Sequence, residues 1–132
     1  MKIYTSYFGN WNSLKKADIV PVSIALFSPK LYEGYRFHFL APTRYMVLGD
    51  CEREEYVSLY RQILDKYGAE KIVQAVNKVS YGKDVALLCY EKPGEFCHRH
   101  LLADYLNEKL NLGVTEFGAD IEKEEDNQLS LF

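Results

Sequence analysis

The sequence predicts one α/β domain with a Rossmann-like, mostly parallel sheet and flanking helices. Strand-like and helix-like segments alternate along the chain, as they do in folds with parallel sheets. Residues 84–90 are almost continuously apolar, which is typical of a strand buried on both faces. The chain has 132 residues, 48% of them hydrophobic, so it can form one core but not two.

The first third of the chain is expected to contain two strands. Residues 3–8 and 19–27 are rich in β-branched and aromatic residues, and turn-forming residues lie between them. Pro21 argues against a regular central strand at that point, so the second strand is expected to begin after it or to be irregular. Residues 32–41 are expected to be an extended, partly aromatic surface segment.

Two helices and the sheet centre are expected next. Apolar residues recur at helical spacing over residues 52–67, and Gly68 follows as a helix-ending residue. Residues 69–79 repeat the pattern and predict a second helix. The apolar segment 84–90 then predicts the central strand, followed by a helix over 97–112 that ends at Gly113 and a short strand over 114–117.

Charge and hydropathy limit the classes of function. The net charge of −3 gives no general attraction to nucleic acid, so any such contact needs a local basic patch. No stretch approaches the ~18 apolar residues of a membrane span, and the N-terminus shows no signal-peptide core. We therefore expect a cytoplasmic protein whose three cysteines are reduced.

The last segment of the chain differs in composition from the rest. Residues 120–127 are strongly acidic and offer little to bury. We therefore expect an α/β domain over residues 1–119 and a flexible acidic tail over residues 120–132.

The loop between the central strand and the following helix carries the candidate catalytic residues. They are Cys97, His98, Arg99, Glu91 and Cys89. Ligands bind beyond the carboxyl ends of strands in parallel sheets, and a helix N-terminus favours an anion such as a thiolate. Cys97 would therefore be an activated nucleophile, Arg99 would hold a phosphate or carboxylate, and Glu91 would serve as general base or orient a neighbour.

Other interpretations of this loop stay open. Cys89 and Cys97 could be small buried hydrophobic residues beside a polar first helical turn. A zinc site could use Cys89, Cys97, His98 and His100, but the chain has no Cys-x-x-Cys pair, so we expect neither a metal nor a cofactor. Cys51, next to two glutamates that oppose ionisation, is interpreted as structural.

Residues 87–101, LLCYEKPGEFCHRHL, resemble the signature of the DUF488 family: a leucine-rich strand, a Cys-x-Glu turn and a Cys-His-Arg helix start. The resemblance extends over about residues 1–118 and implies a compact Rossmann-like domain whose activity is unsettled. One departure concerns anion binding. Many members carry an arginine where this chain has residues 25–29, ALFSP. The missing cation would weaken an anion-binding interpretation, unless Arg36 or Arg44 replaces it.

The C-terminal pentapeptide resembles the motif by which bacterial replication and repair proteins dock on the DNA sliding clamp. Leu131 and Phe132 are apolar anchors, and Gln128 offers an amide to a polar pocket. The alternative is a chain end that packs on its own domain. The complete candidate clamp-binding segment is Gln128, Leu129, Ser130, Leu131 and Phe132.

A second aromatic cluster is a candidate nucleic-acid site. Arg36, His38 and Arg44 alternate with aromatic residues, as the solvent face of a strand would. Such alternation also occurs in ordinary cross-strand packing.

Two hypotheses follow for the function. The first is a clamp-recruited enzyme whose cysteine site acts on a nucleotide or on nucleic acid, with recruitment supplying proximity to the substrate. The alternative is a non-catalytic clamp-binding or nucleic-acid-associated module, in which the Cys-His-Arg loop only binds an anion or stabilises the turn. Neither hypothesis fixes the oligomeric state.

Overall fold

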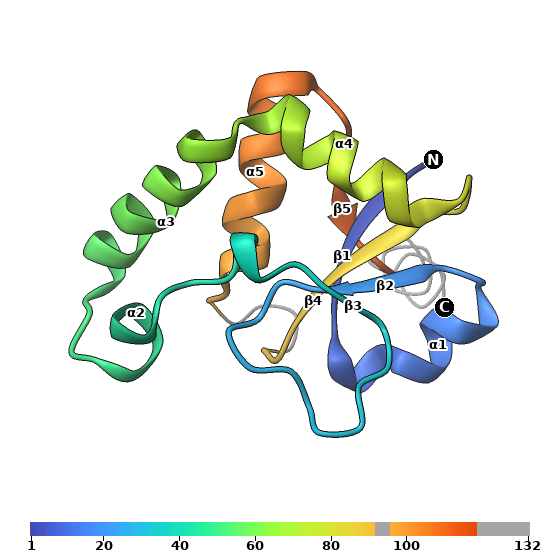
Figure 1. Cartoon of the computed structure of the whole chain (residues 1–132), viewed down its shortest axis with the longest axis horizontal. Coiled ribbons are helices and arrows are strands. Elements are labelled where there is room, and N and C mark those ends of the chain that lie inside the picture. The colour runs from blue at the N-terminus through green and yellow to red at the C-terminus, as the bar shows by residue number, and fades with distance from the viewer. Residues whose placement is uncertain (92–95, 119–132) are drawn as a thin grey trace, which may run out of the picture.

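The computed structural model describes residues 1–91 and 96–118, which form a five-stranded, all-parallel sheet (Figure 1). The strand order is β3-β2-β4-β1-β5, so the apolar strand predicted at the sheet centre is there. The strands are β1 (Ile3–Tyr7), β2 (Val20–Ser23), β3 (Tyr35–Arg36), β4 (Val85–Cys89) and β5 (Thr115–Glu116).

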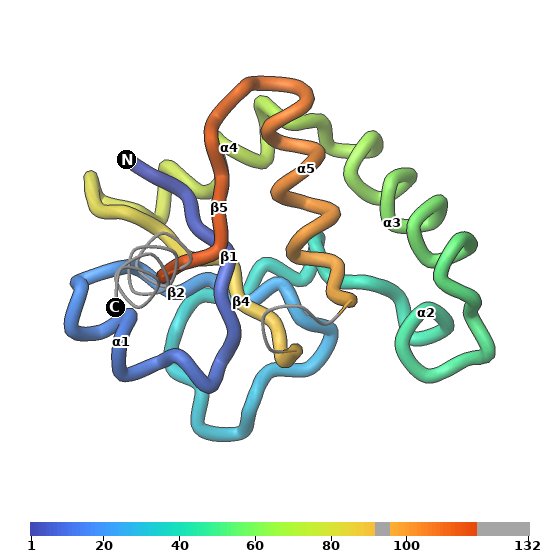
Figure 2. Tube along the Cα trace, turned by 180° about the vertical axis from the view of Figure 1, so that it is seen from behind, coloured from blue at the N-terminus to red at the C-terminus, as the bar shows by residue number. Residues whose placement is uncertain are grey.

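The helices cover both faces of this sheet (Figures 1 and 2). On one face, α3, α4 and α5 pack over a core that includes Val22, Val85 and Leu87. On the other face, Leu14 of α1 packs against Ala86 and Leu88. The helical segments are η1 (Phe8–Asn10), α1 (Trp11–Lys16), η2 (His38–Leu40), α2 (Arg44–Leu48), α3 (Arg53–Tyr67), α4 (Ala69–Ser80) and α5 (His98–Leu110). The predicted Rossmann-like α/β fold is confirmed.

Strand β4 shows why the sequence predicted the fold well. All five of its residues are buried, and successive side chains alternate between the two helical layers. The strand lies between β1 and β2, with Tyr7 of β1 opposite Cys89 and Ser23 of β2 opposite Leu88. The carboxyl ends of three strands therefore meet beside Cys89.

The expectation for Pro21 was wrong, because this residue lies inside β2. The backbone N–H groups of Val20 and Ile24 donate to β4, at 2.8 Å to Asp84 O and 3.0 Å to Leu88 O. Donors alternate along a strand, so position 21 faces the opposite edge, where β3 first pairs at Val22. Proline therefore removes no hydrogen bond from the ladder.

Local structure differs from prediction in three further places. Two short helices, α1 and α2, were not predicted, and the segment expected to be extended over 32–41 contains only β3 and the turn η2. Helix α5 ends at Leu110 with Asn111 in the left-handed conformation, at φ 52°, and not at Gly113. Side-chain amides tolerate this conformation, so asparagine can end a helix as glycine does.

The predicted domain boundary at residue 119 lies outside the described residues. The acidic tail and its pentapeptide lie outside them. Within residues 1–91 and 96–118, no helix combines the length and the apolar character that a membrane crossing requires.

Candidate functional site

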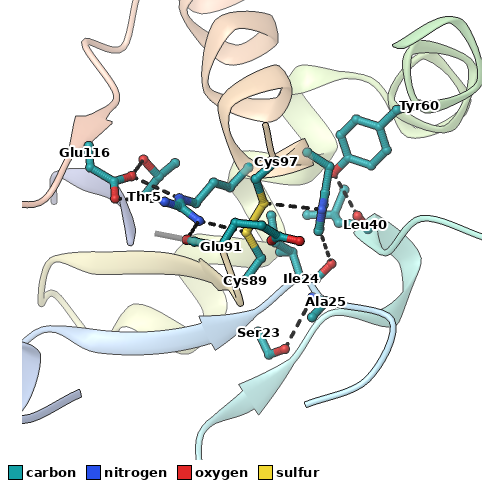
Figure 3. Close-up of a disulfide and its surroundings, with 12 residues drawn as sticks. Thr5, Ser23, Ile24, Ala25, Leu40, Tyr60, Cys89, Glu91, Cys97 and Glu116 are labelled. Atoms are coloured by element: carbon teal, nitrogen blue, oxygen red, sulfur yellow. Dashed lines mark hydrogen bonds and ion pairs between the residues drawn. A yellow bond between two sulfur atoms is a disulfide. The ribbon is translucent and has the colours of Figure 1, made fainter. Parts of the chain in front are cut away.

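The cysteine loop lies at the carboxyl end of β4, where it leads into α5 (Figure 3). Cys89 is the last residue of β4, and Cys97 is the residue that precedes α5 as its N-cap. Both are buried, and their sulfur atoms form a disulfide. All three cysteines were expected to be reduced, whereas in the structure the sulfur atoms of these two are joined.

His98 is a buried, neutral base beside this pair. Its Nε2 lies 2.6 Å from the carbonyl oxygen of Ile24, which follows β2, and its ring contacts Tyr60 edge-on at 5.3 Å between centroids. Burial lowers the pKa of His98 to about 4, with the charge of Arg99 adding to the effect. A carbonyl can only accept, so Nε2 carries the proton and Nδ1 presents a lone pair 3.7 Å from Cys97 Sγ.

Arg99 is fully buried and binds the other cysteine. Its Nη1 donates to Cys89 Sγ at 3.0 Å and also to the backbone carbonyl of Glu91. Its Nε and Nη2 donate to the two carboxylate oxygens of Glu116, at 3.0 and 3.1 Å. The sequence analysis placed this guanidinium beside Cys97 with its fork free for an anion. In the structure it lies on Cys89, and Glu116 occupies the fork.

Glu116 is a site residue that the sequence analysis missed. It belongs to β5, and Thr5 of β1 donates to its Oε1 at 2.7 Å (Figure 3). This contact holds the carboxylate toward Arg99. It stands alone in sequence, 17 residues after Arg99. The available signal was the predicted strand over 114–117, whose position beside the first strand would have placed a carboxylate near the cysteine loop.

A cavity of about 410 Å³ opens beside the disulfide. Its wall is mostly apolar and aromatic, which suits a small, flat, largely apolar ligand. The lining residues are Ala25, Leu26, Phe27, Pro42, Met46, Val47, Cys51, Arg53, Tyr56, Cys89, Tyr90, Glu91, Phe96, Cys97 and His98. Four of the five candidate catalytic residues line this cavity, and Arg99 lies behind it.

Two arginines stack on aromatic rings of the cavity wall. The guanidinium of Arg53 lies 4.6 Å from the ring centre of Phe96, and that of Arg44 lies 5.8 Å from the ring centre of Phe27. Phe27 belongs to the segment where the family resemblance led us to expect an arginine. Arg44 therefore brings a cation to that wall.

The three candidate nucleic-acid residues are exposed but do not share one site. Arg36 donates to the carbonyl of Tyr32 at 3.0 Å and stacks on its ring. His38 lies in η2, and neither it nor Arg36 lines the cavity. Only Arg44 lies beside the cavity, through its contact with Phe27.

Cys51 is a free cysteine that also lines the cavity. Partial burial and the carboxylates of Glu55 and Glu52 raise its pKa. The direction agrees with the sequence argument that the neighbouring glutamates oppose its ionisation. Cys51 is therefore an internal reference for the reactivity of the paired cysteines.

The class of protein follows from the fold and the site: a parallel α/β domain with a cysteine pair, a neutral histidine and a buried arginine beside one cavity. A family model described as "DUF488-N3a: Active DUF488-N3 subclade" matches residues 28–110. The chain belongs to the DUF488 family, as the cysteine signature predicted. No curated protein and no solved structure matches the chain.

Proposed function

We propose that this protein is a cysteine-dependent enzyme that acts on the base of a nucleotide or of nucleic acid. The observation that carries the proposal is the contact between buried Arg99 and Cys89 Sγ at the wall of an aromatic cavity. A guanidinium at 3.0 Å stabilises negative charge on sulfur, and a thiolate is the reactive form of cysteine. The disulfide is then the resting, oxidised state, which a small-molecule thiol must reduce before reaction.

The two cysteines take different roles in the reduced enzyme. Cys89, held by Arg99, is the nucleophile, whereas Cys97 keeps its proton and donates it toward His98 Nδ1. The Cys89 thiolate adds to an electrophilic carbon of the bound ring, forming a carbon–sulfur bond. The displaced π electron pair moves onto the ring, which takes the proton of Cys97. This assignment exchanges the role that the sequence analysis gave to Cys97.

The cavity supports a base with an attached phosphate as the substrate class. Phe27, Tyr56 and Phe96 offer surfaces on which a flat ring can stack. Arg44 and Arg53 form no ion pair with any carboxylate in residues 1–91 and 96–118, so both are available to a phosphate. A local pair of cations can bind an anion despite the net charge of −3.

Alkylation of the full-length, reduced protein tests the proposal. Iodoacetamide at neutral pH, followed by peptide mass spectrometry, should modify Cys89 well before Cys51. A mixture of nucleoside monophosphates should slow this reaction, and the Cys51→Ser variant should show the same Cys89 rate as the unmodified chain. Equal, slow modification of all three cysteines would contradict the enzyme proposal and favour the non-catalytic module.

The recruitment half of the proposal rests on the pentapeptide at the chain end, which lies outside the described residues. We infer that Gln128, Leu131 and Phe132 dock the protein on the bacterial DNA sliding clamp. Purified clamp should retain the full-length chain and lose it when residues 128–132 are deleted. Retention of the truncated chain would overturn this inference without affecting the alkylation test.

A further inference from the structure

Neither atom of the contact between His98 Nδ1 and Cys97 Sγ carries a proton when Cys97 is in the disulfide. Nε2 of His98 carries the ring proton because its partner is the carbonyl of Ile24. A disulfide sulfur also carries no proton, so Nδ1 and Cys97 Sγ face each other at 3.7 Å with lone pairs only. His98 is 5% exposed, so water does not easily supply the missing donor. The oxidised site therefore leaves a buried nitrogen lone pair without a proton donor.

The same lone pair belongs to a group of three potential metal ligands. Cys89 Sγ, Cys97 Sγ and His98 Nδ1 lie within 4.8 Å of one another, and all three residues are buried. We propose that the reduced protein binds one Zn²⁺ through these three atoms, whereas the disulfide form, which has no thiolates, does not bind the metal. The inference goes beyond the proposed function, because it concerns metal binding and not a covalent reaction.

The geometry is close to that of a zinc site before any metal binds. Zn–S and Zn–N bonds of about 2.3 and 2.05 Å place neighbouring tetrahedral sulfur and nitrogen ligands roughly 3.6 Å apart. The present Cys97 Sγ to His98 Nδ1 distance is 3.7 Å. Once the disulfide is reduced, the two sulfur atoms have to separate to about 3.8 Å. Cys89 Sγ, which lies within 4.8 Å of His98 Nδ1, has to settle at roughly 3.6 Å from it.

The surroundings support the ligands as they do in zinc proteins. A ligating histidine usually donates its other ring N–H to a carbonyl or carboxylate, and the Ile24 carbonyl already holds His98 in this way. Arg99 donates to Cys89 Sγ, which is a hydrogen bond to a ligand sulfur. All three residues line the cavity, so a water or a bound molecule can take the fourth position.

The charges of the buried groups also balance. Arg99 and Glu116 form a bidentate pair and cancel each other. Two ionised cysteines would leave a buried charge of −2, which is costly without a partner. A divalent cation removes that charge, and binding releases the two thiol protons to solvent.

The experiment uses the full-length chain and Co²⁺ as a spectroscopic probe for the zinc site. The protein is reduced, freed of reductant without oxygen, and titrated with Co²⁺. We expect sulfur-to-cobalt charge-transfer bands and the d–d bands of a tetrahedral site, saturating at one equivalent and lost on addition of Zn²⁺. The oxidised chain should give none of these bands, which provides a control without any mutation.

Variants identify the ligands. Cys51→Ser should keep the spectrum unchanged, whereas Cys89→Ser and Cys97→Ser should each abolish the one-equivalent binding. His98→Gln should lose the tetrahedral signal while keeping a donor for the Ile24 carbonyl. Absence of binding by the reduced chain, or binding that survives oxidation or Cys97→Ser, would overturn the inference.

The Co²⁺ titration and the alkylation experiment can fail independently of each other. Selective alkylation of Cys89 without Co²⁺ binding would support the proposed enzyme and contradict the metal site. Co²⁺ binding without selective alkylation of the metal-free chain would support the metal site and contradict the proposed enzyme. When both occur, one equivalent of Zn²⁺ should slow the alkylation of Cys89 and leave that of Cys51 unchanged.

Discussion

Two arginine–glutamate pairs in this protein have nearly the same geometry and opposite surroundings. Arg61 of α3 binds Glu108 of α5 through two hydrogen bonds of 3.0 and 3.2 Å, and Arg99 binds Glu116 through two of 3.0 and 3.1 Å. The side chains of the first pair are 41% and 56% exposed, and those of the second are 0% and 14% exposed.

The difference shows that geometry alone does not determine what an ion pair contributes. Water can replace either partner of the Arg61–Glu108 pair, so this pair adds little to stability. Neither water nor salt can replace a partner of Arg99, whose third nitrogen is committed to Cys89. The buried pair therefore holds the guanidinium against Cys89, whereas the exposed pair only joins two helices.

The largest expected effect is that of Arg99→Gln. Removing the guanidinium leaves Glu116 half-buried without its cation, and breaking a buried pair costs about 3–5 kcal/mol. Urea unfolding of the oxidised full-length variant should show this loss in the free energy of unfolding. Glu116→Gln, which removes the other charge, should be destabilising in the same direction. A loss no larger than that of Arg61→Gln would show that burial does not make the Arg99–Glu116 pair contribute more to stability than the exposed pair.

The next effect is a pH dependence of stability carried by buried His98. Its pKa in the folded protein is about 4, below the ordinary 6.5, so the unfolded chain binds the proton more readily. The stabilisation is present above pH 6.5 and is lost as the pH falls toward 4, by about 1.4 kcal/mol per pH unit where only the unfolded state is protonated. Across the window the total is about 3 kcal/mol.

Unfolding midpoints of the oxidised chain between pH 4.5 and 7 measure this slope. The His98→Gln variant is the control, because it keeps a donor for Ile24 but has no titrating group. Its stability should change much less over the same range. An unchanged slope would place the titration elsewhere in the protein.

A smaller effect is expected for the tyrosine that packs on His98. The hydroxyl of Tyr60 donates to the carbonyl of Leu40 at 2.8 Å, and both groups are buried. Tyr60→Phe leaves that carbonyl without its donor and should cost about 1–2 kcal/mol in the free energy of unfolding. Tyr45→Phe is the matched surface variant, because Tyr45 donates to Glu55 in solvent, and it should leave the unfolding midpoint unchanged.

The smallest effect is expected for Arg61→Gln. The variant removes two hydrogen bonds to Glu108 with distances like those of Arg99, and the ion pairs with Glu108 and Asp65. Because water replaces the lost partner of Glu108, the urea midpoint should stay within experimental scatter of the parent chain. Raising the salt concentration should likewise change the parent chain little. A clear loss of stability would show that the α3–α5 contact depends on this pair.

Periodicity predicted the fold well where burial was complete. The apolar strand β4 and the helices α3 and α4 depend on many residues that point to one answer, so the sequence was sufficient. Helices α1 and α2 are too short for a helical period to stand out, and each buries a single residue, Leu14 and Met46. Pro21 misled because the direction of its missing N–H depends on strand pairing.

The residues of the cysteine loop were predictable, but their contacts and the contribution of Glu116 were not. The residues of the cysteine loop are close in sequence and form a recognisable motif, so they could be nominated together. The contacts of Arg99 with Cys89 and of His98 with Ile24 depend on how α5 leaves the sheet. Glu116 and Thr5 approach Arg99 from opposite ends of the chain, and no local pattern reports such a contact.

The position of Glu116 in the last short strand has a consequence for how the protein matures. Thr5 is translated early and Glu116 late, so β5 can pair with β1 only after the chain has been synthesised through residue 116. During synthesis the guanidinium of Arg99 thus exists for a time without the carboxylate that orients it. The position of the Arg99 guanidinium seen in the structure therefore requires a chain that has been synthesised through residue 116.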